Sequence, residues 1–298
     1  MQRNTFPMGN IQNYHEATAA EARNAVRGLD GVTTVPLYRQ RINGDDGAGY
    51  REAENVFGVL NTSTDRITMP VSSRYTPLSH YDGFNPALDA IEHAGIDHEM
   101  MVSLENNRDE AGLYVLFPDL MFNEDREGGG MMYGLRFRNH YNKKMSFRGH
   151  VFCWRVQCLN GSTHAQLGEM VVSAMHVDSQ IQSLRDQIDT FVTRMLSNAS
   201  MIEQVVGNAI ESPINFRDYD EVVRTLTATV TGSDRRSTAI AEAIPLETNR
   251  FQMFNAITAH ASHAPKISWQ TRDRLLDMAE RNVLMAREVV PVPMPVAV

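Results

Sequence analysis

The sequence lacks the short motifs that mark the commonest enzyme chemistries. It contains no GxxxxGK[ST] phosphate loop, no GxGxxG, no HExxH and no CxxC pair. The glycine run at 128–130 has the spacing of neither phosphate-binding loop. We therefore expect no ATP use, no cofactor, no bound metal and no catalytic residues, and the chain is not predicted to be an enzyme.

Cysteine is scarce and long apolar runs are absent. Cys153 and Cys158 are the only two cysteines, and five residues of extended strand span roughly 16 Å, too far for a disulfide without a sharp turn. No run approaches the roughly 18 apolar residues that cross a bilayer, and the N-terminal residues hold no apolar signal segment. These absences predict reduced thiols, a cytoplasmic location and no membrane partner.

Acidic residues are missing from one long stretch. Residues 128–168 contain no Asp or Glu, although the whole chain carries a net charge of −8. The stretch holds six cations, so the rest of the chain sums to −14. A basic segment in an acidic chain indicates an anionic partner at one place.

Aromatic residues alternate with these cations, which suits single-stranded DNA: cations neutralise phosphates and rings stack on bases. The nine candidate nucleic-acid-binding residues are Arg136, Arg138, Tyr141, Lys143, Lys144, Arg148, Phe152, Trp154 and Arg155. The other interpretation of the same pattern is a β-hairpin whose aromatic residues belong to the core and whose cations are ordinary surface.

The expected fold class is α+β: an antiparallel β-sheet covered by a long helix, followed by a helical C-terminal region. In the predicted strand 131–138, Met131, Tyr133, Leu135 and Phe137 point one way while Arg136, Arg138 and His140 point the other. Apolar residues then recur every three or four positions over 177–210, which predicts one long helix lying on the sheet.

Three regions follow from this pattern. Residues 1–65 are expected to form an N-terminal helix, at 15–27, and a β-hairpin. Residues 66–212 would form the central sheet and the long helix, with an earlier helix capped by Asn85, started by Pro86 and ended by Gly95. Residues 213–298 would be helical, with a Pro-rich extended tail.

Three blocks of sequence carry a resemblance to a known family. They are SRYTPLS at 73–79 with the helix 84–95, FCWRVQCLNG at 152–161, and NRFQMFNAIT at 249–258. In order and spacing they resemble the phage- and plasmid-borne family called domain of unknown function 932. The resemblance covers roughly residues 65 to 290. It implies a virus or plasmid acting inside a microbial host cell, and it supplies no catalytic residues. The sequence departs from the family at Met253 and at Ala259, where an acid is common.

The predicted order of helix, antiparallel strands and long helix is also similar to that of single-strand annealing proteins of the Red-beta and RecT type. That similarity implies an ATP-independent protein that binds and anneals single-stranded DNA in recombination or replication, as a homo-oligomeric ring or filament. Fold alone does not fix function, so this interpretation depends on the basic segment.

Two alternatives stay open at this point. One is a self-assembling viral structural or host-interaction protein that binds no nucleic acid, whose basic hairpin would dock on a neighbouring subunit. The other is a metal-dependent nuclease or hydrolase that uses His260, His263 and nearby acids, because two imidazoles three residues apart on a helix can share a metal.

Overall fold

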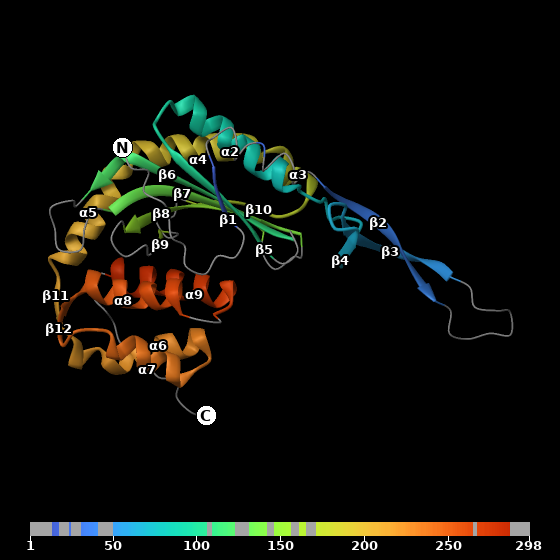
Figure 1. Ribbon diagram of the computed structural model, residues 1–298. Helices are drawn as coiled ribbons and strands as arrows, with labels where there is room; N and C mark the ends of the chain where they lie inside the picture. Colours follow the sequence, from blue (N-terminus) through green and yellow to red (C-terminus); the bar gives the residue numbers. More distant parts are fainter. Residues whose placement is uncertain are drawn as a thin grey trace.

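The computed structural model describes residues 14–17, 24, 31–40, 50–105, 109–122, 131–141, 146–155, 161–164, 171–264 and 267–286. Its centre is a seven-stranded antiparallel sheet in the order β1-β5-β6-β7-β8-β10, with β9 also paired to β8 (Figure 1). The strands are β1 (Tyr14–Ala17), β5 (Glu99–Glu105), β6 (Glu110–Phe122), β7 (Met131–His140), β8 (Phe147–Arg155), β9 (Gly161–His164) and β10 (Val171–Ala174).

Two helices, α2 (His80–Ala94) and α4 (Leu184–Ser197), cover one face of this sheet (Figure 1). The ring of Phe137 on β7 meets the ring of Phe191 on α4 edge-on, with centroids 5.8 Å apart. The hydroxyl of Tyr133 donates to the carbonyl of Met195 over 2.7 Å. The apolar residues of β7 thus face a helix, which confirms the expected α+β fold and the expected apolar face.

The single helix expected over 177–210 is wrong. The segment forms three helices, α3 (Asp178–Gln182), α4 and α5 (Ala199–Ile210). The break after α4 falls at Asn198, whose side-chain amide donates to the carbonyl of Arg194 over 2.7 Å and whose backbone leaves the helical region. Asparagine favours such local bonds to the backbone over helix continuation. The break lets α5 leave the sheet and turn toward the C-terminal helices (Figure 1).

Helix α2 starts earlier than its sequence predicts. Ser79, not Asn85, is the N-cap, and its hydroxyl accepts from the amide of Asp82 over 2.9 Å. Pro86 therefore sits inside the helix, where it cannot donate to the fourth residue before it. Gly95 ends the helix with φ 66°, as predicted, because only glycine adopts that left-handed conformation without strain.

A separate three-stranded sheet projects from one end of the body (Figure 1). It consists of β2 (Val32–Gln40), β3 (Tyr50–Asn61) and β4 (Arg66–Ser72), in that order, and we call it the arm. This arrangement changes two expected boundaries. Strand β4 was assigned to the central region but pairs with β3, and β1, expected as part of a helix, pairs with β5.

The C-terminal part is helical, as expected, and lies beyond the other face of the sheet (Figure 1). Its elements are the short ribbon β11 (Pro213–Asn215) and β12 (Glu247–Asn249), a 3-10 turn (Phe216–Asp218), α6 (Asp220–Thr231), α7 (Asp234–Glu242), α8 (Arg250–His263), α9 (Trp269–Ala279) and a π-helical turn (Glu280–Leu284). In Figure 1, α8 and α9 lie between the sheet and the pair α6–α7. The Pro-rich tail lies outside the described residues.

Within the described ranges, the helices are too short or too polar to cross a lipid bilayer.

Candidate functional site: a polar sheet face and a projecting arm

The face of the central sheet opposite α2 and α4 is lined by polar side chains. Residues that pair across strands point to the same face. By register, Arg136 pairs with Tyr114 on one side and His150 on the other, and Arg138 pairs with Gly112 and Arg148. We call this surface the polar sheet face. It consists of Ser103, Glu110, Gly112, Tyr114, Arg136, Arg138, His140, Arg148 and His150.

Tyr114 organises the centre of the polar sheet face. The guanidinium carbon of Arg136 lies 5.2 Å from the centroid of its ring, within the range of a cation–π contact. Arg138 donates from Nη2 to the Tyr114 hydroxyl over 3.2 Å. Gly112 makes room for this packing, because a Cβ there would lie 2.8 Å from the hydroxyl of Ser103. Both arginines are thus part of a packed polar layer.

Three of the predicted nucleic-acid-binding residues are buried. Arg136 is 4% exposed, Arg138 6% and Tyr141 1%. A phosphate or base reaches these three side chains only if the cover over them moves away. Arg148 is the one predicted site residue that is exposed among those whose side chains the structure describes.

The remaining candidates lie partly or wholly outside the described residues. Lys143 and Lys144 lie outside the described residues, between the end of β7 and the start of β8 in the sequence. Phe152, Trp154 and Arg155 lie in β8, where their backbones pair with Gly134, Met132 and Met131, but their side chains are outside the description. Contact of these residues with DNA stays a prediction.

Tyr141 joins the arm to the body instead of facing a ligand. Its ring stacks on the ring of His80, with centroids 4.0 Å apart, and its hydroxyl accepts from the amide of His80 over 3.0 Å. On the other side it packs in a small cluster with Val59 and Val71 of the arm. The aromatic residue that sequence assigned to base stacking therefore holds the root of the arm.

Asp109 is the second anchor of the arm. Its carboxylate accepts from the side-chain amide of Asn61 over 3.0 Å and from the guanidinium of Arg66 over 3.2 Å. Its backbone carbonyl accepts from the amide of Tyr141 over 2.8 Å. One buried residue thus binds two strands of the arm and the end of β7.

A third contact at the arm root pairs Tyr75 with His176. The Tyr75 hydroxyl lies 2.7 Å from Nδ1 of His176, and the rings stack with centroids 5.2 Å apart. Burial raises the pKa of Tyr75 above its ordinary value. Burial, together with the nearby His140, lowers the pKa of His176 to about 4. Both side chains are therefore neutral at neutral pH.

A cavity of about 330 Å³ lies beside this pair, and its lining includes Arg74, Ser146 and Met175. Tyr75 and His176 bond to each other through Nδ1, which leaves Nε2 of His176 buried without a hydrogen-bond partner among the described residues. We assign the pair a structural part in holding the arm.

The arm carries an apolar surface on the side that faces away from Tyr141. In register, Val35 pairs with Gly58, Leu60 pairs with Ile67, and a Cβ on Gly58 would touch both Leu37 and Ile67. Val56 is 38% exposed and Ile67 47%. We call Val35, Leu37, Val56, Leu60 and Ile67 the outer arm face; none belongs to a core cluster of the described residues.

Sequence reasoning missed the outer arm face, although a signal for it exists. Apolar residues alternate at positions 35 and 37 and at 56, 58 and 60, with Gly58 leaving space between them. From the sequence we predict a β-hairpin in this region and assign no function to its apolar side.

The described residues hold no group of three or more His, Cys, Asp or Glu that could bind a metal ion. Burial and the positive charge of Arg236 lower the pKa of His260. A neighbouring guanidinium is unfavourable for a bound metal cation. The hydrolase alternative gains no support at His260 and His263, and it stays untested.

No family model, no curated protein and no solved structure matches the chain. The resemblance to domain of unknown function 932 and to annealing proteins therefore stays a prediction.

Proposed function

We propose that the chain is a self-assembling structural protein whose arm packs on a neighbouring copy. The observation that carries the proposal is the outer arm face: an apolar surface on a sheet that projects from the body. Apolar patches on projecting elements mark sites of protein association.

The energetics of the outer arm face favour a protein partner. Burying the exposed part of its five aliphatic side chains contributes on the order of several kcal/mol at about 25 cal/mol per Å². Strand β2 is also an edge strand in the described sheet, so its outer N–H and C=O groups are available for pairing with another chain. Side-chain burial and strand pairing would act together at one contact.

Charge argues against DNA as the partner of the arm. Residues 31–72 contain four arginines and five acidic residues. One of the four, Arg66, is held by Asp109. Affinity for nucleic acid depends on an excess of cations, which the arm does not have.

The test is the mass of the full-length protein in solution, measured by light scattering after size exclusion. We expect an oligomer in the wild type and a monomer in the double variant Val56→Asp and Ile67→Asp. The matched control is Met201→Asp on α5, because Met201 is 38% exposed, as Val56 is. A monomeric wild type, or a double variant that assembles normally, overturns the proposal.

Binding of single-stranded DNA is the second candidate function. The observation that favours it is the exposed Arg148, which pairs in register with Arg138 and follows Lys143 and Lys144 closely in the sequence. Three arginines, Arg136, Arg138 and Arg148, share one face with the acids Glu99 and Glu110. The exposed guanidinium of Arg148 supports an anionic ligand at this edge of the polar sheet face.

Salt dependence tests this second candidate with a fluorescent oligonucleotide. We expect affinity to fall with salt, and Arg148→Ala to reduce the slope by roughly 0.7, the value for one phosphate contact on a single strand. Arg185→Ala is the control, because Arg185 is exposed on the helix-covered side. No measurable binding, or equal slopes for both variants, removes DNA binding through Arg148.

A further inference from the structure

The cavity of about 330 Å³ beside Tyr75 and His176 lies where the arm joins the body, and we call it the root cavity. Three segments of the chain form it: the end of β4 with the turn that follows, Ser146 just before β8, and the residues after β10. The amide of Thr76 donates to the carbonyl of His176 over 2.9 Å, which ties the first segment to the third. The walls of the root cavity are therefore held together by the chain itself.

Arg74 gives the root cavity its charge. It is exposed, and it is the one charged side chain in the described lining. No carboxylate of the described residues pairs with it. A guanidinium without a carboxylate partner favours an anion, and its planar fork fits both oxygens of a carboxylate. The lining thus indicates a ligand with one negative charge.

The Tyr75–His176 pair leaves one hydrogen without an acceptor. Both side chains are neutral at neutral pH, because burial raises the pKa of Tyr75 and lowers that of His176 to about 4. The pair then carries one O–H and one N–H hydrogen, and the 2.7 Å bond between the hydroxyl and Nδ1 uses one of them. The other lies on Nε2 or on the hydroxyl, depending on the tautomer, and neither atom has a further partner in the described part of the chain. Because the pair is largely buried, a ligand that brings an acceptor oxygen to this hydrogen is stabilised.

Most of the surface of the root cavity is apolar. Met175 is 57% exposed in its lining, and Val177 is half-buried. The rings of Tyr75 and His176 stack with centroids 5.2 Å apart. The volume lies at the small end of the range for ligand pockets. The root cavity therefore suits a short apolar chain or a single ring, and it is too small for a helix or strand of a partner protein.

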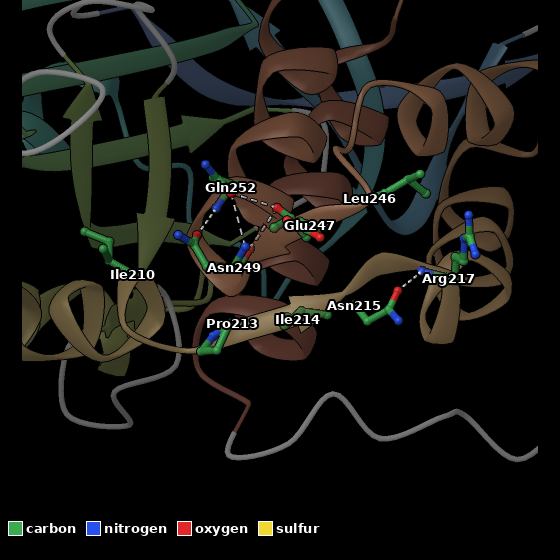
Figure 2. Close-up of a pocket in the computed structure, with 10 residues that line it drawn as sticks. Ile210, Pro213, Ile214, Asn215, Arg217, Leu246, Glu247, Asn249 and Gln252 are labelled. Carbon is green, nitrogen blue, oxygen red and sulfur yellow. Dashed lines mark hydrogen bonds between the residues drawn. The ribbon is translucent and has the colours of Figure 1, made fainter.

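A larger groove beside the β11–β12 ribbon shows no such preference (Figure 2). Its volume is about 760 Å³, and its lining carries one charge of each sign, Arg217 and Glu247. Asn249 and Gln252 bond to each other there, in a reciprocal capping box at the start of α8. Because the charges are balanced and these two amides are paired, nothing in the groove selects one class of ligand.

We infer that the root cavity binds a small-molecule carboxylate with an apolar chain or ring. The carboxylate lies against Arg74 and accepts the spare hydrogen of the Tyr75–His176 pair, while the apolar part lies against Met175 and Val177. A phosphate ester fits less well, because its second negative charge finds no second cation in the described lining. The site goes beyond the proposed function and does not require assembly of the chain.

Titration calorimetry with octanoate tests the site on the full-length protein. We expect saturable binding of a single octanoate. Acetate keeps the carboxylate without the chain, and octan-1-ol keeps the chain without the charge, so both should bind more weakly. If octanoate shows no saturable binding, or if octan-1-ol binds as tightly as octanoate does, the inference is overturned.

Two variants place the binding in the root cavity. Arg74→Gln removes the cation, and we expect octanoate to bind roughly tenfold more weakly. Tyr75→Phe combined with His176→Phe removes both hydrogens of the pair and keeps two rings, and we expect a similar loss. The control is Arg217→Gln, at an exposed arginine away from the root cavity, which should bind octanoate as the wild type does.

Thermal unfolding checks that each variant is folded. If the double variant is unfolded, Arg74→Gln decides the test, because Arg74 is exposed and has no described partner to lose. An unchanged affinity in Arg74→Gln places octanoate elsewhere on the protein and overturns the inference. An equal loss in Arg217→Gln also overturns it, because it reveals a general effect of charge instead of a site.

Discussion

Tyr141 shows how one residue can be given a functional role by its neighbours in sequence and a structural one by its neighbours in space. It follows the basic strand β7 and precedes two lysines, so its sequence context indicates base stacking. In the fold its hydroxyl bonds to the backbone of helix α2 and its ring lies between the body and the arm. At this scale the arm is held by a few buried residues.

Removing the Tyr141 hydroxyl tests its role. Tyr141→Phe leaves the buried amide of His80 without the oxygen that accepts from it. We expect the free energy of unfolding in urea to fall by about 1–3 kcal/mol. Tyr219→Phe, at a half-buried position in the C-terminal region, is the control and should change it little. An unchanged stability in Tyr141→Phe would contradict the anchoring role.

His176 predicts a pH dependence of stability. Its pKa is lowered from 6.5 to about 4 in the folded chain. Below pH 6.5 the unfolded chain therefore binds a proton that the folded chain does not, and stability is lost as pH falls toward 4. At pH 4.5 the loss from this group is about 2.5 kcal/mol.

The measurement is urea unfolding at pH 7 and pH 4.5 for the wild type and His176→Gln, whose amide can still bond to Tyr75. We expect the variant to lose less stability on acidification than the wild type does. His93→Gln, at the exposed end of α2, should behave as the wild type. Equal losses in all three proteins would refute the assignment to His176.

Among the elements, strand β8 and helix α5 differ in how tightly they are packed. Gly149 on β8 lies under Phe137 and Val172, and a Cβ there would come within 2.6 Å of both. Gly207 on α5 has nothing within 4 Å of the corresponding position. The sheet packs tightly at Gly149, whereas α5 has open space beside Gly207.

This difference predicts opposite effects of the same substitution. Gly149→Ala should lower the free energy of unfolding by about 1–3 kcal/mol, because the ring of Phe137 must shift. Gly207→Ala should raise it by about 0.5–1 kcal/mol, because alanine is the better helix former. Thermal or urea unfolding of both variants measures the sign, and the same sign for both would contradict the packing described for β8.

For the whole molecule, the arm defines the expected behaviour. Because copies are proposed to join through the arm, assembly stabilises the folded state by mass action. We expect the midpoint of thermal unfolding to rise with concentration in the wild type, and to stay constant in the arm variant with Val56→Asp and Ile67→Asp. Scanning calorimetry over a tenfold range of concentration measures both, and a constant midpoint in the wild type would contradict assembly.

Much of the fold follows from local pattern. The glycine end of α2 and the apolar face of β7 were both predicted, because backbone preference and period-2 alternation are properties of neighbouring residues. The start of α2 and the break at Asn198 were not. In both places a polar side chain forms a local hydrogen bond to the backbone that interrupts or starts a helix. Whether that bond forms depends on how the helix packs in the fold.

In the candidate site, too, some features follow from the local sequence and others only from the packing of the fold. The sequence by itself determined that Arg136 and Arg138 share one face of their strand, because side chains alternate along any strand. That Arg148 of the next strand lies on the same face depends on the register between the strands, which the fold sets. Only the tertiary structure decided that Arg136 and Arg138 are buried, and that the apolar residues of the arm are left partly open. Burial depends on which distant segments cover a face, and no local repeat of residues contains that information.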